Sequence, residues 1–94
     1  PRFNIQKYNI GGHFAELHTE RENISNMHRV FAWMTYLNDV DDSGKTHFTH
    51  YDLKIKPEIG KTLIWPAEWT HAHRGNIINS GSKYIITGWL TLPK

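Results

Sequence analysis

The pattern of apolar and polar positions predicts short β-strands along most of the chain. Phe3 to Tyr8 alternates apolar and polar residues, and an aromatic-rich stretch runs from about His28–Arg29 to Leu37, which is typical of strands. Further strand-like segments are His13–Glu20, Thr46–Lys56, Thr62–Trp65, His71–Ile78 and Lys83–Leu92. No segment keeps the 3.6-residue apolar period over three turns, so we expect little helix.

Polar segments separate these stretches and indicate the fold class. Asn38–Gly44, Pro57–Gly60 and Asn79–Ser82 have the residues of tight turns, and Arg21–Met27 is polar without periodicity and is expected to be a loop. Seven or eight short strands with turns every 8–12 residues or so indicate an all-β sandwich or barrel. The 94 residues fit one domain with a limited core.

Composition narrows the possible functions. There is no cysteine, which excludes disulfides, thiolate catalysis and cysteine-ligated metal sites, and fits a reducing compartment. No secretory leader or membrane-length apolar run is visible, so we expect a cytoplasmic protein that does not span a membrane. The net charge of +2 has no block of like charge, which makes a nucleic-acid partner unlikely. Seven histidines point instead to metal binding or proton transfer.

Three groups of residues are candidates for chemistry. In a strand, His18 and Glu20 project to one face, and a second imidazole would complete the two-histidine, one-carboxylate triad of non-haem iron. Taken alone, His18-Thr19-Glu20 is weak evidence, because an exposed polar strand end is the commoner explanation of an isolated match. His71 and His73 also share a strand face, so parity does not decide between them. Lys83 begins an otherwise apolar strand, which is usually a solvated position.

Several loose motifs occur together in a specific order from Tyr8 to Trp89. They are Tyr8-x2-Gly11-x2-Phe14-x3-His18-x-Glu20, Arg29-x6-Tyr36-Leu37-Asn38-Asp39, Gly44-x-Thr46-x-Phe48, Pro57-x2-Gly60 and His73-x9-Lys83, with Trp89 beyond. In this order and spacing the chain resembles the 2-oxoglutarate- and Fe(II)-dependent dioxygenases, in particular the prolyl 4-hydroxylase-like subgroup. Their joint occurrence is far more specific than any single motif.

The resemblance implies a double-stranded β-helix (jelly roll) in which residues 1–94 form one oxygenase catalytic domain. It implies that the metal ligands and catalytic residues are His18, Glu20 and His73. It implies that the cosubstrate 2-oxoglutarate contacts Tyr8, Tyr36, Thr46, Lys83 and Trp89. Lys83 would pair with the remote carboxylate, because a buried ammonium is costly unless it meets an anion.

The activity implied by the resemblance is hydroxylation of a small-molecule or peptide substrate, with peptidyl proline among the candidates, and with release of succinate and CO2. Fe(II) and 2-oxoglutarate are the implied cofactors, and ascorbate is a further candidate. Two departures stand out: the family's usual acid is aspartate where this chain has Glu20, and family domains carry helices before the first strand. We therefore expect that the domain could lack an N-terminal segment that other family members have.

Two other functions fit the same residues. A non-catalytic, cupin-like jelly roll would bind metal through four ligands, His18, Glu20, His71 and His73. A degenerate family member would serve as a protein-interaction domain. Four protein ligands would leave less room for a bidentate cosubstrate, and a charge-transfer band on binding of 2-oxoglutarate would count against both alternatives.

Strand parity also predicts which side chains face outward. If Tyr36 points to the cosubstrate, Ala32 and Met34 also point inward. The corresponding inward residues of the last strand are Lys83, Thr87 and Trp89. The outward residues are Phe31, Trp33, Leu37, Tyr84, Ile86, Leu90 and Leu92. Together these would form an apolar patch larger than a soluble monomer usually exposes, so we expect a homo-oligomer or a covering N-terminal segment.

Overall fold

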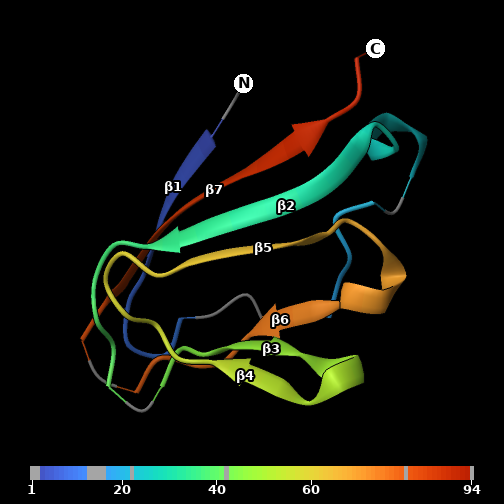
Figure 1. Ribbon diagram of the computed structural model, residues 1–94. Helices are drawn as coiled ribbons and strands as arrows, with labels where there is room; N and C mark the ends of the chain where they lie inside the picture. The colour runs from blue at the N-terminus through green and yellow to red at the C-terminus, as the bar shows by residue number, and fades with distance from the viewer. Residues whose placement is uncertain (1–2, 13–16, 22, 42, 80, 94) are drawn as a thin grey trace.

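Two antiparallel sheets that face each other make up the computed structural model, which describes residues 3–12, 17–21, 23–41, 43–79 and 81–93 (Figure 1). The larger sheet has the order β1 (Phe3–Tyr8), β7 (Lys83–Thr91), β2 (Arg29–Tyr36) and β5 (Thr62–Pro66). The smaller sheet has the order β4 (Leu53–Ile55), β3 (Thr46–Phe48) and β6 (His73–Gly75). This is the predicted all-β jelly roll.

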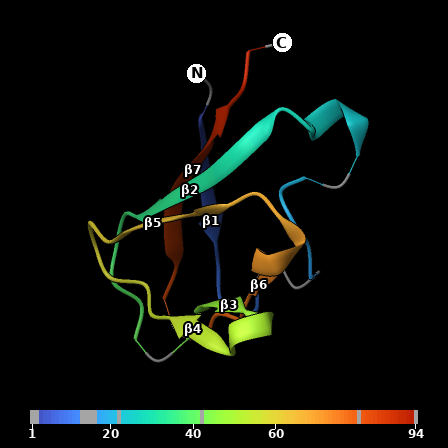
Figure 2. The ribbon, with the colours of Figure 1, turned by 45° about the vertical axis from the view of Figure 1, so that its right-hand side comes forward.

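Helical conformation within the described ranges is limited to three short 3-10 turns, as the sequence predicted. They are η1 (Ile24–Asn26), η2 (Thr49–Tyr51) and η3 (Trp69–His71). η1 lies in the expected Arg21–Met27 loop, where the Asn23 side chain accepts a hydrogen bond from the backbone N–H of Ser25. In the view turned by 45°, η1 projects at the N-terminal end of β2, while η2 and η3 lie beside the smaller sheet (Figure 2).

The core lies between the two sheets and follows the predicted alternation of β2. Ala32, Met34 and Tyr36 are all buried, and they pack in one cluster with Phe48, Trp65 and Ile85. Phe31 and Leu37 lie on the opposite face and are each 40% exposed. The cluster therefore joins β2, β5 and β7 of the larger sheet to β3 of the smaller one.

Two expected strands differ from the structure. Residues 13–16 of the expected strand His13–Glu20 lie outside the described ranges, and of residues 17–20 only His18 makes a β-bridge, to His73. The expected strand His71–Ile78 is reduced to β6, and its first residue belongs to a 3-10 turn that is closed by the hydrogen bond from the backbone N–H of His71 to the carbonyl of Glu68. His71 and His73 therefore do not share a strand face.

Candidate active site

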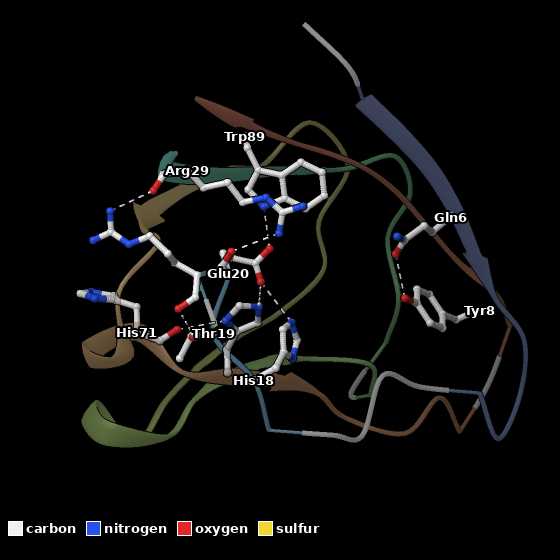
Figure 3. Close-up of polar contacts among 10 residues, drawn as sticks. Gln6, Tyr8, His18, Thr19, Glu20, Arg29, His71 and Trp89 are labelled. Atoms are coloured by element: carbon white, nitrogen blue, oxygen red, sulfur yellow. Dashed lines mark hydrogen bonds and ion pairs between the residues drawn. The ribbon is translucent and has the colours of Figure 1, made fainter. Parts of the chain in front are cut away.

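The structure brings His18, Glu20 and His73 together between the two sheets, where their ligand atoms all lie within 4.8 Å of one another. Oε2 of Glu20 is 3.1 Å from Nε2 of His18 and 3.5 Å from Nε2 of His73. Figure 3 shows Glu20 pointing toward His18. Two imidazoles and one carboxylate directed at a common point are a donor set suited to a divalent transition metal.

A hydrogen bond from outside the cluster fixes the orientation of the His73 ring. Nδ1 of His73 lies 3.0 Å from the main-chain carbonyl of His71, and only an N–H at Nδ1 can donate to a carbonyl. Nε2 is then the ring nitrogen that keeps a free lone pair, and it is the atom that faces Glu20. This arrangement is the usual one around metal-binding histidines.

Electrostatics favour the metal-binding form of these side chains. Burial lowers the pKa of His73 below its ordinary value, so the imidazole is neutral at neutral pH. For Glu20, burial acts to raise the pKa, but the hydrogen bonds with His18 and Trp89, together with the positive charge that the two imidazoles carry when protonated, lower it. The cluster therefore offers one carboxylate and a neutral imidazole at His73.

A cavity of about 430 Å³ opens beside this cluster. Its lining includes the predicted site residues Tyr8, His18, Glu20, Thr46, His73, Lys83 and Trp89. Apolar side chains of β2 and β7, among them Met34 and Ile85, form another part of the wall. The cavity thus combines the potential metal ligands with both polar and apolar surfaces.

Lys83 is buried in this cavity without an acidic partner. Only 3% of the residue is exposed, and none of the ion pairs found among the described residues includes it. Its Nζ donates to the carbonyl of Gly44 at 2.9 Å and lies 5.1 Å from the centre of the Tyr8 ring. Burial lowers the pKa of Lys83 to about 8. A buried ammonium with so little compensation is suited to an anionic ligand.

The three hydroxyl residues expected to contact the cosubstrate occupy different positions. Tyr8 lines the cavity, and its hydroxyl donates to Oε1 of Gln6 at 2.8 Å, as Figure 3 shows. Thr46 also lines the cavity. Tyr36 is fully buried behind Thr46, its hydroxyl lies 2.6 Å from Oγ1 of Thr46, and burial raises its pKa to about 12.

His71 lies outside the three-residue cluster. Its ring contacts Tyr51 and Phe48, with ring centroids 5.2 and 6.1 Å away, and it points away from Glu20 (Figure 3). Strand parity did not separate His71 from His73, because both belong to one expected strand, and only the spacing of His73 to Lys83 in the family motif favoured His73. The 3-10 turn η3 distinguishes them.

Two further residues of the site had no role assigned from the sequence. Arg29, at the start of β2, lines the cavity and contacts both Glu20 and Trp89. Trp65, on β5, also lines the cavity and packs edge-on against His73 with ring centroids 5.0 Å apart. Arg29 begins one of the family motifs in the sequence, whereas Trp65 gave no signal beyond its place in an apolar strand.

Comparison with known proteins identifies the family. The sequence model of the 2OG-Fe(II) oxygenase superfamily matches residues 3–91. The chain belongs to this superfamily. No curated protein shows significant sequence similarity to the chain. The match covers β1 to β7, so both sheets lie within the region that the family model describes.

Solved structures with a similar fold include two prolyl hydroxylases. The viral collagen prolyl hydroxylase of Paramecium Bursaria Chlorella virus-1 has a TM-score of 0.78 and 21% identity, and the similarity covers 99% of this chain and 62% of that one. A Pseudomonas putida prolyl-4-hydroxylase has a TM-score of 0.79 and 16% identity, over 98% of this chain and 51% of that one. The chain therefore spans less than two thirds of either hydroxylase.

A cupin also shares the general fold. An RmlC-like cupin from Desulfovibrio desulfuricans has a TM-score of 0.55 and 18% identity, over 90% of this chain and 69% of that one. These likenesses confirm the predicted jelly roll.

In the part of the chain that the structure describes, no helix is long and apolar enough to cross a membrane.

Proposed function

We propose that this 2OG-Fe(II) oxygenase is catalytically competent and hydroxylates a peptide or small-molecule substrate with release of succinate and CO2. The observation that carries the proposal is the buried ammonium of Lys83, which lines the same cavity as His18, Glu20 and His73. A dicarboxylate cosubstrate would supply the anion that Lys83 lacks, while its other end reaches the metal.

The residues present fit a bound Fe(II). His18, Glu20 and His73 supply one carboxylate oxygen and two imidazole nitrogens, and three protein ligands leave room for a cosubstrate and dioxygen on an octahedral metal. In this proposal Lys83 binds the remote carboxylate of 2-oxoglutarate. Thr46 donates a hydroxyl hydrogen bond to it, with the Thr46 hydroxyl oriented by Tyr36. Tyr8 donates to it as well, and gives up its hydrogen bond to Gln6 when the cosubstrate is bound.

When bound, the iron and 2-oxoglutarate together supply the oxidising chemistry that inserts an oxygen atom into the substrate. The chain's own residues bind and orient the reactants. Trp89 and the apolar side chains of β2 and β7 line the cavity, and an apolar wall strengthens the electrostatic attraction between Lys83 and a carboxylate. Peptides that contain proline are the first substrates to test, because the similar hydroxylases are named for prolyl hydroxylation.

The geometry favours the oxygenase over a four-ligand, cupin-like site. The latter would require the side chain of His71, which packs on Tyr51 and Phe48 instead. The described histidine and carboxylate groups that could share a metal are the three of the cluster. Three ligands and a nearby buried cation support a site that accepts a chelating acid.

Anaerobic titration of the Fe(II)-loaded protein with 2-oxoglutarate tests the proposal. We expect a weak visible charge-transfer band, because a 2-oxo acid that chelates iron through two oxygens gives one. In air, with ascorbate present, we expect succinate to form on addition of a proline-containing peptide. Bound iron with no band at saturating 2-oxoglutarate would contradict the proposed site. A band without hydroxylation of any peptide or small molecule would contradict catalytic competence.

A further inference from the structure

The two carboxylate oxygens of Glu20 have different partners. Oε2 faces the imidazoles of His18 and His73 at 3.1 and 3.5 Å. Oε1 accepts a hydrogen bond of 2.9 Å from the indole N–H of Trp89, which lies 69 residues further along the chain on β7. Figure 3 shows this bond on the side of Glu20 opposite His18. One oxygen is therefore directed at the metal ligands and the other is held away from them.

Arg29 contacts both the ring of Trp89 and the backbone of Glu20. Its guanidinium carbon lies 3.9 Å from the centre of the Trp89 ring, which is a close cation–π contact. Its Nη1 also donates to the main-chain carbonyl of Glu20 at 3.1 Å. Arg29 thus holds the backbone of Glu20 and the ring that binds the side chain of Glu20. We call Arg29 and Trp89 the Glu20 brace.

We propose that the Glu20 brace makes Trp89 a positioning residue, which leaves a single oxygen of Glu20 available to the metal; this rests on the proposed function. A free glutamate side chain is flexible, and a carboxylate can bind a metal through one oxygen or through both. Binding through both would occupy a position that the cosubstrate or dioxygen needs. The brace lets the longer Glu20 act as a one-oxygen ligand where the family usually has aspartate.

A purely structural role and a positioning role for Trp89 require different parts of its side chain. Packing and the contact with Arg29 need only an aromatic ring, whereas positioning needs the indole N–H. Trp89→Phe keeps a ring and removes the donor. Trp69→Phe is the matched control, because Trp69 is 67% exposed and does not line the cavity.

The contact itself is tested in the metal-free protein. The chain has four tryptophans, so the indole N–H signals of labelled protein can be assigned by single Trp→Phe variants. We expect the Trp89 indole proton to exchange with water at least about tenfold more slowly than that of Trp69, since a hydrogen bond to a charged group is worth roughly 1.5–3 kcal/mol. We expect Glu20→Ala to remove this protection. Equal exchange rates in the wild type and Glu20→Ala would overturn the brace.

The consequence for the metal is tested with Co(II) as a spectroscopic probe. We expect Trp89→Phe to change the visible Co(II) spectrum and to weaken 2-oxoglutarate binding about tenfold, while Trp69→Phe changes neither. A wild-type spectrum and cosubstrate affinity in Trp89→Phe would overturn the positioning role. Failure of the wild type to bind Co(II) or Fe(II) would overturn the proposed function and the positioning role with it, while leaving the metal-free contact established.

Glu20→Asp is a second variant, which does not alter Trp89. Aspartate is one methylene shorter, so it cannot hold the indole and face both imidazoles from the same backbone position. We expect weaker Co(II) binding by about tenfold and faster exchange of the Trp89 indole proton, although aspartate is the family's usual acid. Co(II) binding as tight as in the wild type would overturn the proposal.

Discussion

His18 and His73 are directly opposed across an antiparallel β-bridge. The backbone N–H of each donates to the carbonyl of the other, at 3.0 and 2.9 Å, and their ring centroids are 4.2 Å apart. Opposed residues in an antiparallel pair project to the same face. The main chain therefore brings these two imidazoles together, although they lie 55 positions apart in the sequence.

This pairing predicts that His73, and not His71, is a metal ligand. We expect His73→Ala to lower Fe(II) affinity at least about a hundredfold, because it removes a ligand atom directed at Glu20. We expect His71→Ala to change the affinity less than about threefold, since the backbone carbonyl that orients His73 remains. Anaerobic Fe(II) titration of both variants measures this. Loss of binding in His71→Ala with retention in His73→Ala would reverse the assignment.

The buried ammonium of Lys83 predicts a pH dependence of cosubstrate binding. Burial lowers its pKa to about 8 from an ordinary 10.5, so above pH 8 the free protein must take up a proton to pair with a carboxylate. We expect the dissociation constant for 2-oxoglutarate to rise up to about tenfold per pH unit above 8. Tyr8, which faces Lys83, stays neutral because burial raises its pKa. Calorimetric titration across pH 6.5–9.5 or so measures the effect.

The Lys83 ammonium should also make the stability of the fold depend on pH, with stability rising where cosubstrate affinity falls. Between about pH 8 and 10.5 the unfolded chain binds the Lys83 proton and the folded chain does not, so the free energy of unfolding rises with pH. Lys83→Met should lose this rise in stability and also the pH dependence of cosubstrate binding. A Lys83→Met variant whose 2-oxoglutarate affinity matches the wild type at pH 7 would show that Lys83 does not bind the cosubstrate.

Gly44 is predicted to tolerate no side chain. Its φ is +66°, and a Cβ there would lie 2.5 Å from Cδ1 of Ile78 and 3.4 Å from Cδ of Lys83. We expect Gly44→Ala to cost about 2–4 kcal/mol of unfolding free energy, from the left-handed conformation and the overpacking together. Gly60→Ala is the matched control, because φ is +82° and no atom lies within 4 Å of its Cβ.

Urea denaturation of both glycine variants separates the two contributions. Gly60→Ala should cost only the conformational part, about 1–2 kcal/mol. Equal losses in the two variants would contradict the packing argument. Since the Gly44 carbonyl accepts the hydrogen bond from Lys83, Gly44→Ala should also weaken 2-oxoglutarate binding, whereas Gly60→Ala should not.

The inward and outward faces of the strands could be predicted from the sequence, because strand parity is a local property. The alternation of β2 correctly places Ala32, Met34 and Tyr36 inside and Phe31 outside. Short strands with frequent turns also indicate the all-β class. These features depend on the two-residue period of an extended chain, which a single sequence displays.

Contacts between distant segments could not be predicted in the same way. The hydrogen bond between Trp89 and Glu20 depends on how β7 lies against the chain after His18, which no local pattern encodes. The short turn η3, closed by the hydrogen bond from His71 to Glu68, likewise overrides the strand-like pattern of His71–Ile78. The residues of the candidate site could be named from the family motifs, but their supporting contacts required the structure.

The outer face of the larger sheet gives the last prediction. Phe3 and Ile5 of β1, Phe31 of β2, Ile64 of β5 and Leu90 of β7 are all exposed, with Ile5 at 66%. The register places Ile5 beside Ile86 and Trp33 beside Ile64, so the patch crosses all four strands. A soluble monomer rarely exposes so much contiguous apolar surface. We expect the isolated 94-residue chain to self-associate through this face.

Sedimentation at increasing concentration tests this expectation with two matched variants. Ile5→Lys places a charge in the patch, and Ile59→Lys places one at a turn, where Ile59 is equally exposed at 67%. We expect Ile5→Lys to raise the dissociation constant for self-association at least about tenfold, because a charge is costly to bury without a partner. Ile59→Lys should leave it unchanged. If the unmodified chain is a stable monomer at high micromolar concentration, or if both variants behave alike, the outer face is not an association surface.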